Sequence, residues 1–113
     1  MDIKEYVDIN INIDMKTLNK DLYELLELTH THITILYYVY ISKNKQIDLS
    51  EVVKQMETNT SILNKQIKQL QSLNYITKYR YEDNMRKVYL AMSEEQVTNT
   101  KALLDLVEDY LQK

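Results

Sequence analysis

Residues 58–87 read TNTSILNKQIKQLQSLNYITKYRYEDNMRK, and this stretch decides the fold. In its first half, apolar residues recur three and four positions apart, which predicts a helix over about 60–73 with one buried face. The apolar positions are Ile62, Leu63, Ile67, Leu70 and Leu73. The second half is rich in β-branched and aromatic residues around a polar turn, which predicts a hairpin over about 75–92. A helix followed directly by a hairpin is the order of elements in the DNA-reading half of a winged helix.

The predicted helix has a polar face opposite its apolar positions. This face carries Ser61, Asn64, Lys65, Lys68 and Gln71. Asn and Gln side chains can form paired hydrogen bonds with adenine edges, and Lys can contact phosphate or guanine. The face therefore suits a DNA major groove.

The hairpin carries a basic cluster near its turn, made by Arg80, Arg86 and Lys87. A single Lys or Arg in such a place is most simply read as solvated surface. Three of them near one tip favour an anionic partner.

A short helix is expected before this stretch, ending at about Glu57. Asp48 and Glu51 have the spacing of a reciprocal helix N-terminal cap. Only residues 58–60 separate this helix from the next, so the two must turn sharply on each other, as in a helix-turn-helix. Before it, Lys43 to Gln46 is interpreted as a connector.

Further upstream, hydroxyls between Thr29 and His32 can cap a largely buried helix over Thr31 to Ser42. From Met15 another helix is expected, with Leu18, Leu22 and Leu25 in a seam able to pack against a second helix or a second chain. In residues 1–14 apolar and polar residues alternate from Val7 to Asp14, which is a strand-like period.

The last helix opens with a second cap pattern, Ser93 to Gln96, and has two neighbouring apolar stripes. Two stripes exceed what one small domain is expected to cover, which predicts a dimer. The residues assigned to this interface are Leu18, Leu22, Leu25, Val97, Leu103, Leu104, Leu106, Val107, Tyr110 and Leu111.

Length and composition indicate one cytoplasmic domain. The 113 residues fit a single domain over 1–113, and the absence of Cys excludes disulfides and thiolate metal sites. No stretch resembles a leader or a membrane span. The net charge is −3, but residues 43–87 hold nine basic against five acidic residues, so the positive charge is central and the flanks are acidic.

The chain contains no Gly and no Pro, so its bends must use other residues. Asn tolerates left-handed backbone angles better than most. Asn44, Asn59, Asn74 and Asn84 each fall where one element is expected to give way to the next.

Nothing in the sequence indicates catalysis, a cofactor or a metal. There is no Gly-rich phosphate loop, and no spacing of Ser and His typical of a triad. His30 and His32 are two residues apart, so they point to different faces of a helix, and no third His or Cys completes a ligand set. Cap or packing roles are favoured for them, and pH sensing by a His stays open.

From about Leu18 onward the chain resembles the staphylococcal accessory regulator (SarA-like) family, a branch of the MarR-type winged-helix transcription regulators. Lys65 to Leu70 is similar to the family's Lys-x-aliphatic-Lys-x-Leu recognition helix. Lys78, Arg80 and Arg86 are similar to its wing pattern, in which an Asp lies four residues after the first Arg. That position is Asn84 here, the acidic residue that usually follows is Met85, and Asp83 offers a substitute.

The resemblance implies a mainly α, α+β winged helix-turn-helix with flanking N- and C-terminal dimerisation helices, and a role in regulating virulence genes. It implies a homodimer that places recognition helices in major grooves and wings in flanking minor grooves of AT-rich double-stranded promoter DNA. The DNA-contacting residues would be Ser61, Asn64, Lys65, Lys68, Lys78, Arg80, Asn84, Arg86 and Lys87. The alternative is a winged-helix module that binds another regulator and not DNA, which the net negative charge and the altered wing tip favour.

Overall fold

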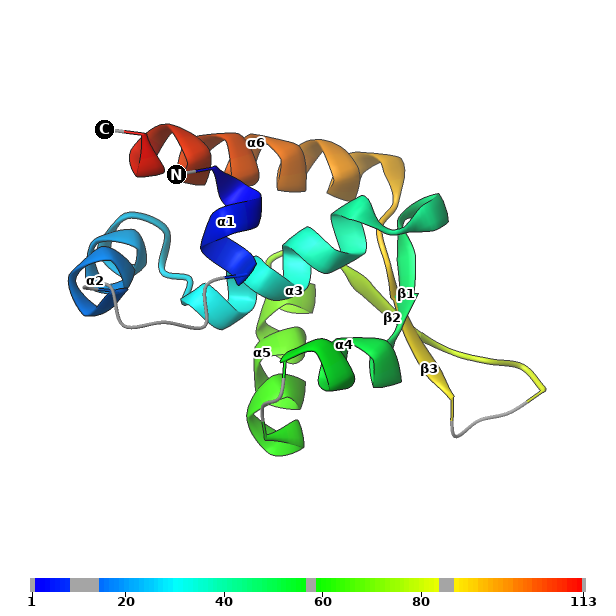
Figure 1. The fold of residues 1–113 in the computed structure, drawn as a ribbon. Helices are drawn as coiled ribbons and strands as arrows, with labels where there is room; N and C mark the ends of the chain where they lie inside the picture. Colours follow the sequence, from blue (N-terminus) through cyan, green and yellow to red (C-terminus); the bar gives the residue numbers. More distant parts are fainter. Residues whose placement is uncertain (1, 9–14, 57–58, 84–86, 113) are drawn as a thin grey trace.

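The computed structural model describes residues 2–8, 15–56, 59–83 and 87–112. Along the chain the elements are α1 (Ile3–Asp8), α2 (Met15–Leu26), α3 (His30–Ile41), a short 3-10 turn η1 (Lys43–Lys45), β1 (Gln46–Asp48), α4 (Leu49–Met56), α5 (Thr60–Ser72), β2 (Thr77–Arg80), β3 (Val88–Ala91) and α6 (Glu94–Leu111) (Figure 1). The predicted mainly α winged helix-turn-helix is confirmed. Helix α5 is the predicted recognition helix, and β2 with β3 forms the predicted wing.

The three strands form one antiparallel sheet in the order β1-β3-β2. Tyr79 pairs with Tyr89 across the wing, and Ile47 of β1 pairs with Leu90 on the other side of β3. Strand β1 was not expected, because its three residues follow a polar connector and carry only one apolar side chain. Pairing with β3 makes it a strand, and that partner lies about forty residues later in the chain.

The core forms where α3, α5 and the sheet meet. From α5 it contains Leu63, Ile67 and Leu70, each at most 1% exposed. Ile62 and Leu73, which periodicity assigned to the same face, are 52% and 54% exposed. That assignment is wrong because α3 covers only a narrow stripe of α5, and these two side chains lie beside it.

Residues 3–8 are helical, so the strand-like interpretation of the N-terminus is wrong for this part. Tyr6 and Val7 are neighbours in sequence and both buried, since α1 packs between α3 and α6. The Tyr6 hydroxyl donates to Asn19 Oδ1 at 2.9 Å, and burial raises the pKa of Tyr6. The rest of the alternating segment, residues 9–14, lies outside the described residues.

Helix α6 lies across α1 and α3 and hides most of its apolar surface within the chain. Leu103, Leu104 and Val107 are buried, as is Leu22 of α2. Val97, Tyr110 and Leu111 pack partly buried against the core. The expectation of two uncovered stripes is therefore wrong, because α3 and α1 both pack against α6 and cover most of its apolar side chains. Leu106 and Leu25 remain 52% and 57% exposed, and the Leu18 side chain lies outside the described set.

Polar side chains close the helix ends in this chain without Gly. Thr29, Asn59 and Ser93 cap α3, α5 and α6, and the expected Ser93–Gln96 capping box is present. Asn44 and Asn74 have left-handed backbone angles, with φ of 58° and 63°, as expected. Asn59 is extended, since it is a cap, and Asn84 lies outside the described residues.

Asn44 provides a test of this backbone role. Asn44→Ala should lower the free energy of unfolding by about 1 kcal/mol, because a Cβ without a local polar partner disfavours the left-handed region. Asn44→Gly should leave it nearly unchanged, since Gly adopts this region freely. Urea unfolding of the three proteins measures both values. Equal losses for Ala and Gly would show that the Asn44 side chain, and not its backbone angle, matters.

Candidate nucleic-acid interface

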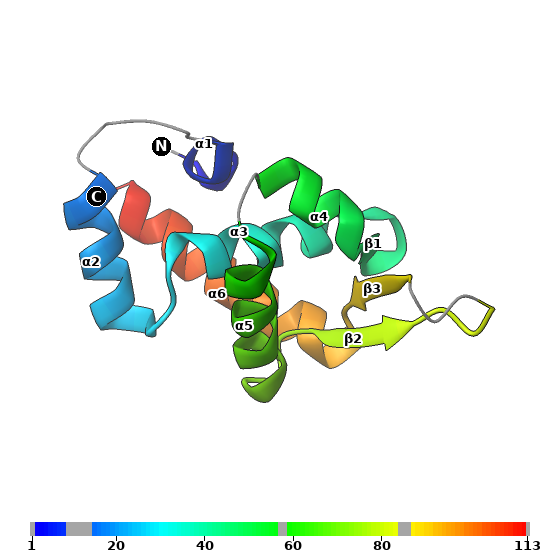
Figure 2. The same cartoon turned by 90° about the horizontal axis from the view of Figure 1, so that it is seen from below.

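Helix α5 and the wing lie on the same side of the molecule, away from α6 (Figure 1). Seen from below, α5 stands between α2 on one side and the wing on the other (Figure 2). Burial of Leu63, Ile67 and Leu70 turns the opposite side of the helix outward. The predicted contact residues on this helix are all exposed: Ser61, Asn64, Lys65 and Lys68.

The wing presents its predicted contact residues less uniformly. Arg80 and Lys87 are exposed, whereas Lys78 is half-buried. The Tyr81 amide donates to the Lys87 carbonyl at 3.1 Å, so pairing continues one step beyond β2 and brings the two basic positions to the start of the tip. Asn84 and Arg86 lie outside the described residues.

Three tyrosines on the wing were not singled out from the sequence. Tyr79 stacks on Tyr89 with ring centroids 5.1 Å apart, and Tyr81 contacts the same ring at 5.0 Å. Side chains alternate between the faces of a strand, so Tyr79 occupies the face of β2 opposite Lys78 and Arg80. Cross-strand aromatic pairs of this kind stabilise a hairpin. Their signal in the sequence was the i, i+2 spacing of Tyr79 and Tyr81.

One buried side chain joins the recognition helix to the wing and to α6. The Gln96 amide bonds to Asn74 at the end of α5 and to Thr77 at the start of β2, each at 3.1 Å. It also accepts from the Ser93 amide at 3.0 Å as part of the α6 cap. Gln96 is 5% exposed, whereas its partners Asn74 and Ser93 are exposed, so these bonds are partly shielded from water. The network links the end of α5, the start of the wing and the N-terminus of α6.

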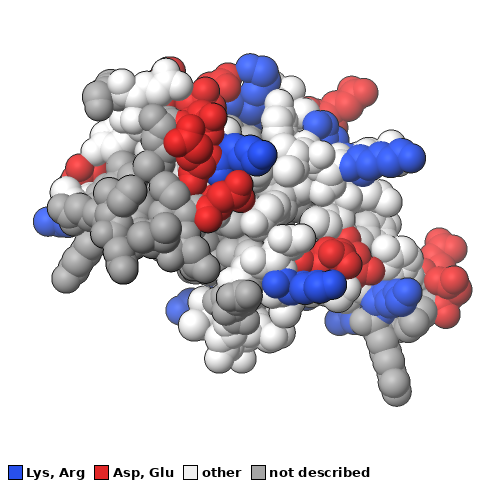
Figure 3. Space-filling view, viewed as in Figure 1, with Lys and Arg blue, Asp and Glu red and all other residues white. Residues whose placement is uncertain are grey.

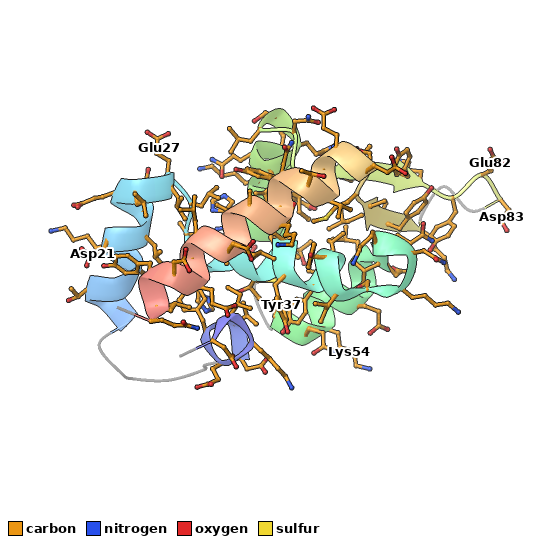
Figure 4. All side chains as sticks on the ribbon, turned by 90° about the horizontal axis from the view of Figure 1, so that it is seen from above. Asp21, Glu27, Tyr37, Lys54, Glu82 and Asp83 are labelled. Carbon is orange, nitrogen blue, oxygen red and sulfur yellow. The ribbon has the colours of Figure 1, made fainter. Side chains whose placement is uncertain are left out.

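Charge is distributed unequally between the two sides. Helix α5 carries two lysines and no acidic residue, whereas α6 carries five acidic residues and one lysine. Acidic side chains gather where α1 and the C-terminal half of α6 lie, with basic ones beside them, and side chains of both signs stand around α4 and the wing (Figure 3). Glu82 and Asp83 project from the wing tip (Figure 4). The basic character of this side is therefore interrupted at the tip.

A groove of about 600 Å³ borders α5 on the side facing α2. Its walls come from the end of α2, the start of α3 and the outer side of α5. The lining residues include Tyr23, Leu28, His32, Ile62, Gln69 and Leu73. Exposed Ile62 and Leu73 belong to this groove, which explains why two apolar side chains lie outside the core.

Within the described ranges, no three His, Asp or Glu side chains gather in a way that could hold a metal ion. Nor is any helix there long and apolar enough to cross a bilayer.

A three-stranded sheet with a two-stranded wing behind a helix-turn-helix defines a winged-helix protein. Residues 17–103 match the family described as transcriptional regulator SarA/Rot, and the chain belongs to this family. Its members are transcriptional regulators and not enzymes. The resemblance seen in the sequence is thereby confirmed.

A curated relative is the HTH-type transcriptional regulator SarR of Staphylococcus aureus. It is 24% identical over 103 residues, which cover 91% of this chain and 90% of SarR. Among solved structures, AbsC, a MarR family transcriptional regulator from Streptomyces coelicolor, superposes with a TM-score of 0.69 at 17% identity, over 82% of this chain and 65% of AbsC.

Sco3205 from the same organism, a MarR family regulator whose structure was determined in complex with DNA, gives a TM-score of 0.66 at 16% identity. The match covers 77% of this chain and 56% of Sco3205. At these identities the structural matches establish the fold alone, which is that of the MarR-type regulators.

Proposed function

We propose that this protein is a transcription regulator that binds double-stranded, AT-rich promoter DNA as a homodimer. The observation that carries the proposal is the exposed polar face of α5, a helix that lies on the same side of the molecule as the wing, in a chain of the SarA/Rot family. Asn64 would read adenine edges in the major groove. Lys65 and Lys68 would contact phosphate or guanine, and the basic wing residues would contact the flanking backbone and minor groove. Such a protein would act in the cytoplasm.

The homodimer would use the outer surfaces of α2 and α6. Tyr110 of α6 donates to Asp21 of α2 at 2.6 Å, so α2 and the C-terminal end of α6 meet. Leu25 and Leu106 are exposed apolar side chains on these helices. Two-fold symmetry would then set the two recognition helices about one helical turn of DNA apart, or a multiple of it.

A second candidate is a winged-helix module that binds another regulator without binding DNA. Glu82 and Asp83 at the wing tip favour it, because two carboxylates there would repel a phosphate backbone. Titration of duplex DNA at several salt concentrations separates the two functions. Binding that weakens steeply with salt supports the regulator, and absence of duplex binding at low salt supports the interaction module.

Asn64→Ala tests base reading. If Asn64 pairs with a base edge, the substitution should weaken binding to a preferred site by about 1 to 3 kcal/mol and leave binding to random duplex nearly unchanged. Fluorescence anisotropy with both duplexes at one salt concentration measures the difference. Equal losses on the two duplexes would instead make Asn64 a contact to the DNA backbone.

Lys68→Ala and Lys101→Ala form a matched pair that tests which side faces DNA. Lys101 lies on α6 and pairs with Asp105 at 2.8 Å, and both side chains are 62% exposed. For a dimer that loses one phosphate contact per chain, Lys68→Ala should reduce the slope of log affinity against log salt by roughly two. Lys101→Ala should leave the slope unchanged. Equal effects of the two substitutions would argue against α5 as the DNA-facing element.

Leu106→Glu tests the dimer. Since Leu106 is half exposed in the single chain, a charge there should leave the unfolding midpoint nearly unchanged but shift the sedimentation coefficient to that of a monomer. Ile41→Glu, at the end of α3 and 56% exposed, is the control that should remain dimeric. A wild-type chain that sediments as a monomer at tens of micromolar, with and without DNA, would rule out the homodimer.

A further inference from the structure

The N-terminus of α3 is tied to the recognition helix through one imidazole. His32 Nδ1 lies 3.0 Å from the Thr29 backbone nitrogen and 2.9 Å from the Thr29 hydroxyl, inside the capping box of α3. Its Nε2 lies 2.7 Å from Oε1 of Gln69 on α5. Gln66, one turn earlier on α5, also reaches the Thr29 hydroxyl at 3.4 Å. Two recognition-helix side chains therefore end on this cap.

The hydrogen-bond geometry requires a neutral imidazole at His32. A backbone N–H can only donate, so Nδ1 must keep its lone pair to accept from Thr29. The ring proton then sits on Nε2 and is donated to the Gln69 carbonyl oxygen. A second proton on Nδ1 could be donated to the Thr29 hydroxyl, but it would leave the Thr29 N–H facing a donor. Protonation is therefore incompatible with the cap as it stands.

His30, two residues away, differs from His32 because its hydrogen-bond partner is an acceptor and not a donor. Its Nε2 lies 2.9 Å from the Tyr6 carbonyl oxygen, which can only accept, and the rings of His30 and Tyr6 meet edge to face. Protonation of His30 leaves this bond in place. The chain has only these two histidines, so one is an internal control for the other.

The surroundings of His32 do not offset a positive charge. The side chain is 5% exposed and lies at the edge of the groove between α2 and α5. The titratable groups that face this groove are Tyr23 from α2, Glu27 from the bend after α2 and Lys65 from α5, so one acidic group is opposed by one basic group. From α1, Tyr6 bonds to His30 and not to His32.

We propose that His32 is a positioning residue for the recognition helix, holding α5 against the α3 cap only in its neutral form, so that mild acid loosens the DNA-reading face. The effect on DNA binding rests on the proposed function. The contacts of His32 with Thr29 and Gln69, which we call the junction between α3 and α5, do not depend on it. Opening of the junction breaks the Thr29 and Gln69 contacts together and exposes the imidazole to water.

The sign of the pH effect follows from proton linkage. Burial lowers the pKa of His32 below its ordinary value of 6.5, although the hydrogen bond to Gln69 acts in the opposite direction. Above pH 6.5 the closed and the opened junction are both neutral, so pH does not shift the balance between them. As the pH falls from 6.5 through the lowered pKa, only the opened junction binds a proton, so acid favours opening. Between pH 7.5 and 5.5 the ratio of opened to closed junction rises up to about tenfold per chain.

The test compares duplex affinity at pH 7.5 and 5.5 in the wild type and in Gln69→Glu. A carboxylate at position 69 would stabilise the imidazolium within the closed junction. We expect the wild type to lose affinity in acid, by up to about tenfold per chain, and Gln69→Glu to lose little or none. Gln71→Glu places the same charge on α5 without a contact to His32 and should keep the wild-type loss. His30→Gln should keep it as well.

A second measurement follows the two imidazoles directly by NMR during a pH titration, with His30→Gln assigning the signals. His32 should titrate below pH 6.5, and its titration should move upward in Gln69→Glu but not in Gln71→Glu. Identical pH profiles of affinity in the two charge variants, or an ordinary His32 titration, would overturn the inference. Absence of duplex binding by the wild type at pH 7.5 would overturn the proposed function instead, and the imidazole titration would still decide whether the junction holds His32 neutral.

Discussion

The arrangement of this protein depends on the burial of one narrow stripe of the recognition helix. Leu63, Ile67 and Leu70 of α5 are almost completely excluded from water, and this fixes the rotation of α5 about its own axis. Once the rotation is fixed, Asn64 and Lys68 must point outward. A helix with the same polar residues and a different buried stripe would expose another face. Packing in the core therefore determines which polar side chains of α5 reach the surface.

The second constraint is the way in which the chain turns without Gly. At the end of α5, Asn74 takes the left-handed angle, and the Tyr75 amide donates to the Leu70 carbonyl at 3.0 Å, which closes the helix in a Schellman arrangement. The Asn74 side chain then accepts from Gln96. A glycine would permit the turn but could not make that bond. The same residue therefore ends the recognition helix and links it to the base of the wing.

These two constraints produce a molecule with distinct sides. One side carries α5 and the wing, with two lysines on the helix, and the other carries acidic α6. The net charge of −3 hides this separation, since the average over the chain mixes a helix with two lysines and no acidic residue with an acidic one. His32 joins α3 in the core to α5, because its imidazole bonds to Gln69 on that helix.

The sequence by itself determined the local elements, because their signals are local. The spacing of apolar residues in α5, the Ser93–Gln96 cap and the tyrosine-rich wing all predicted what the structure contains, and the motif around Lys65 pointed to the correct family. Only the tertiary structure decided which apolar residues are covered, because coverage depends on partners distant in the chain. Strand β1 exists through its pairing with β3, and α1 together with α3 covers most of the apolar surface of α6. The contact between His32 and Gln69 spans 37 positions, and no local pattern in either segment could indicate it.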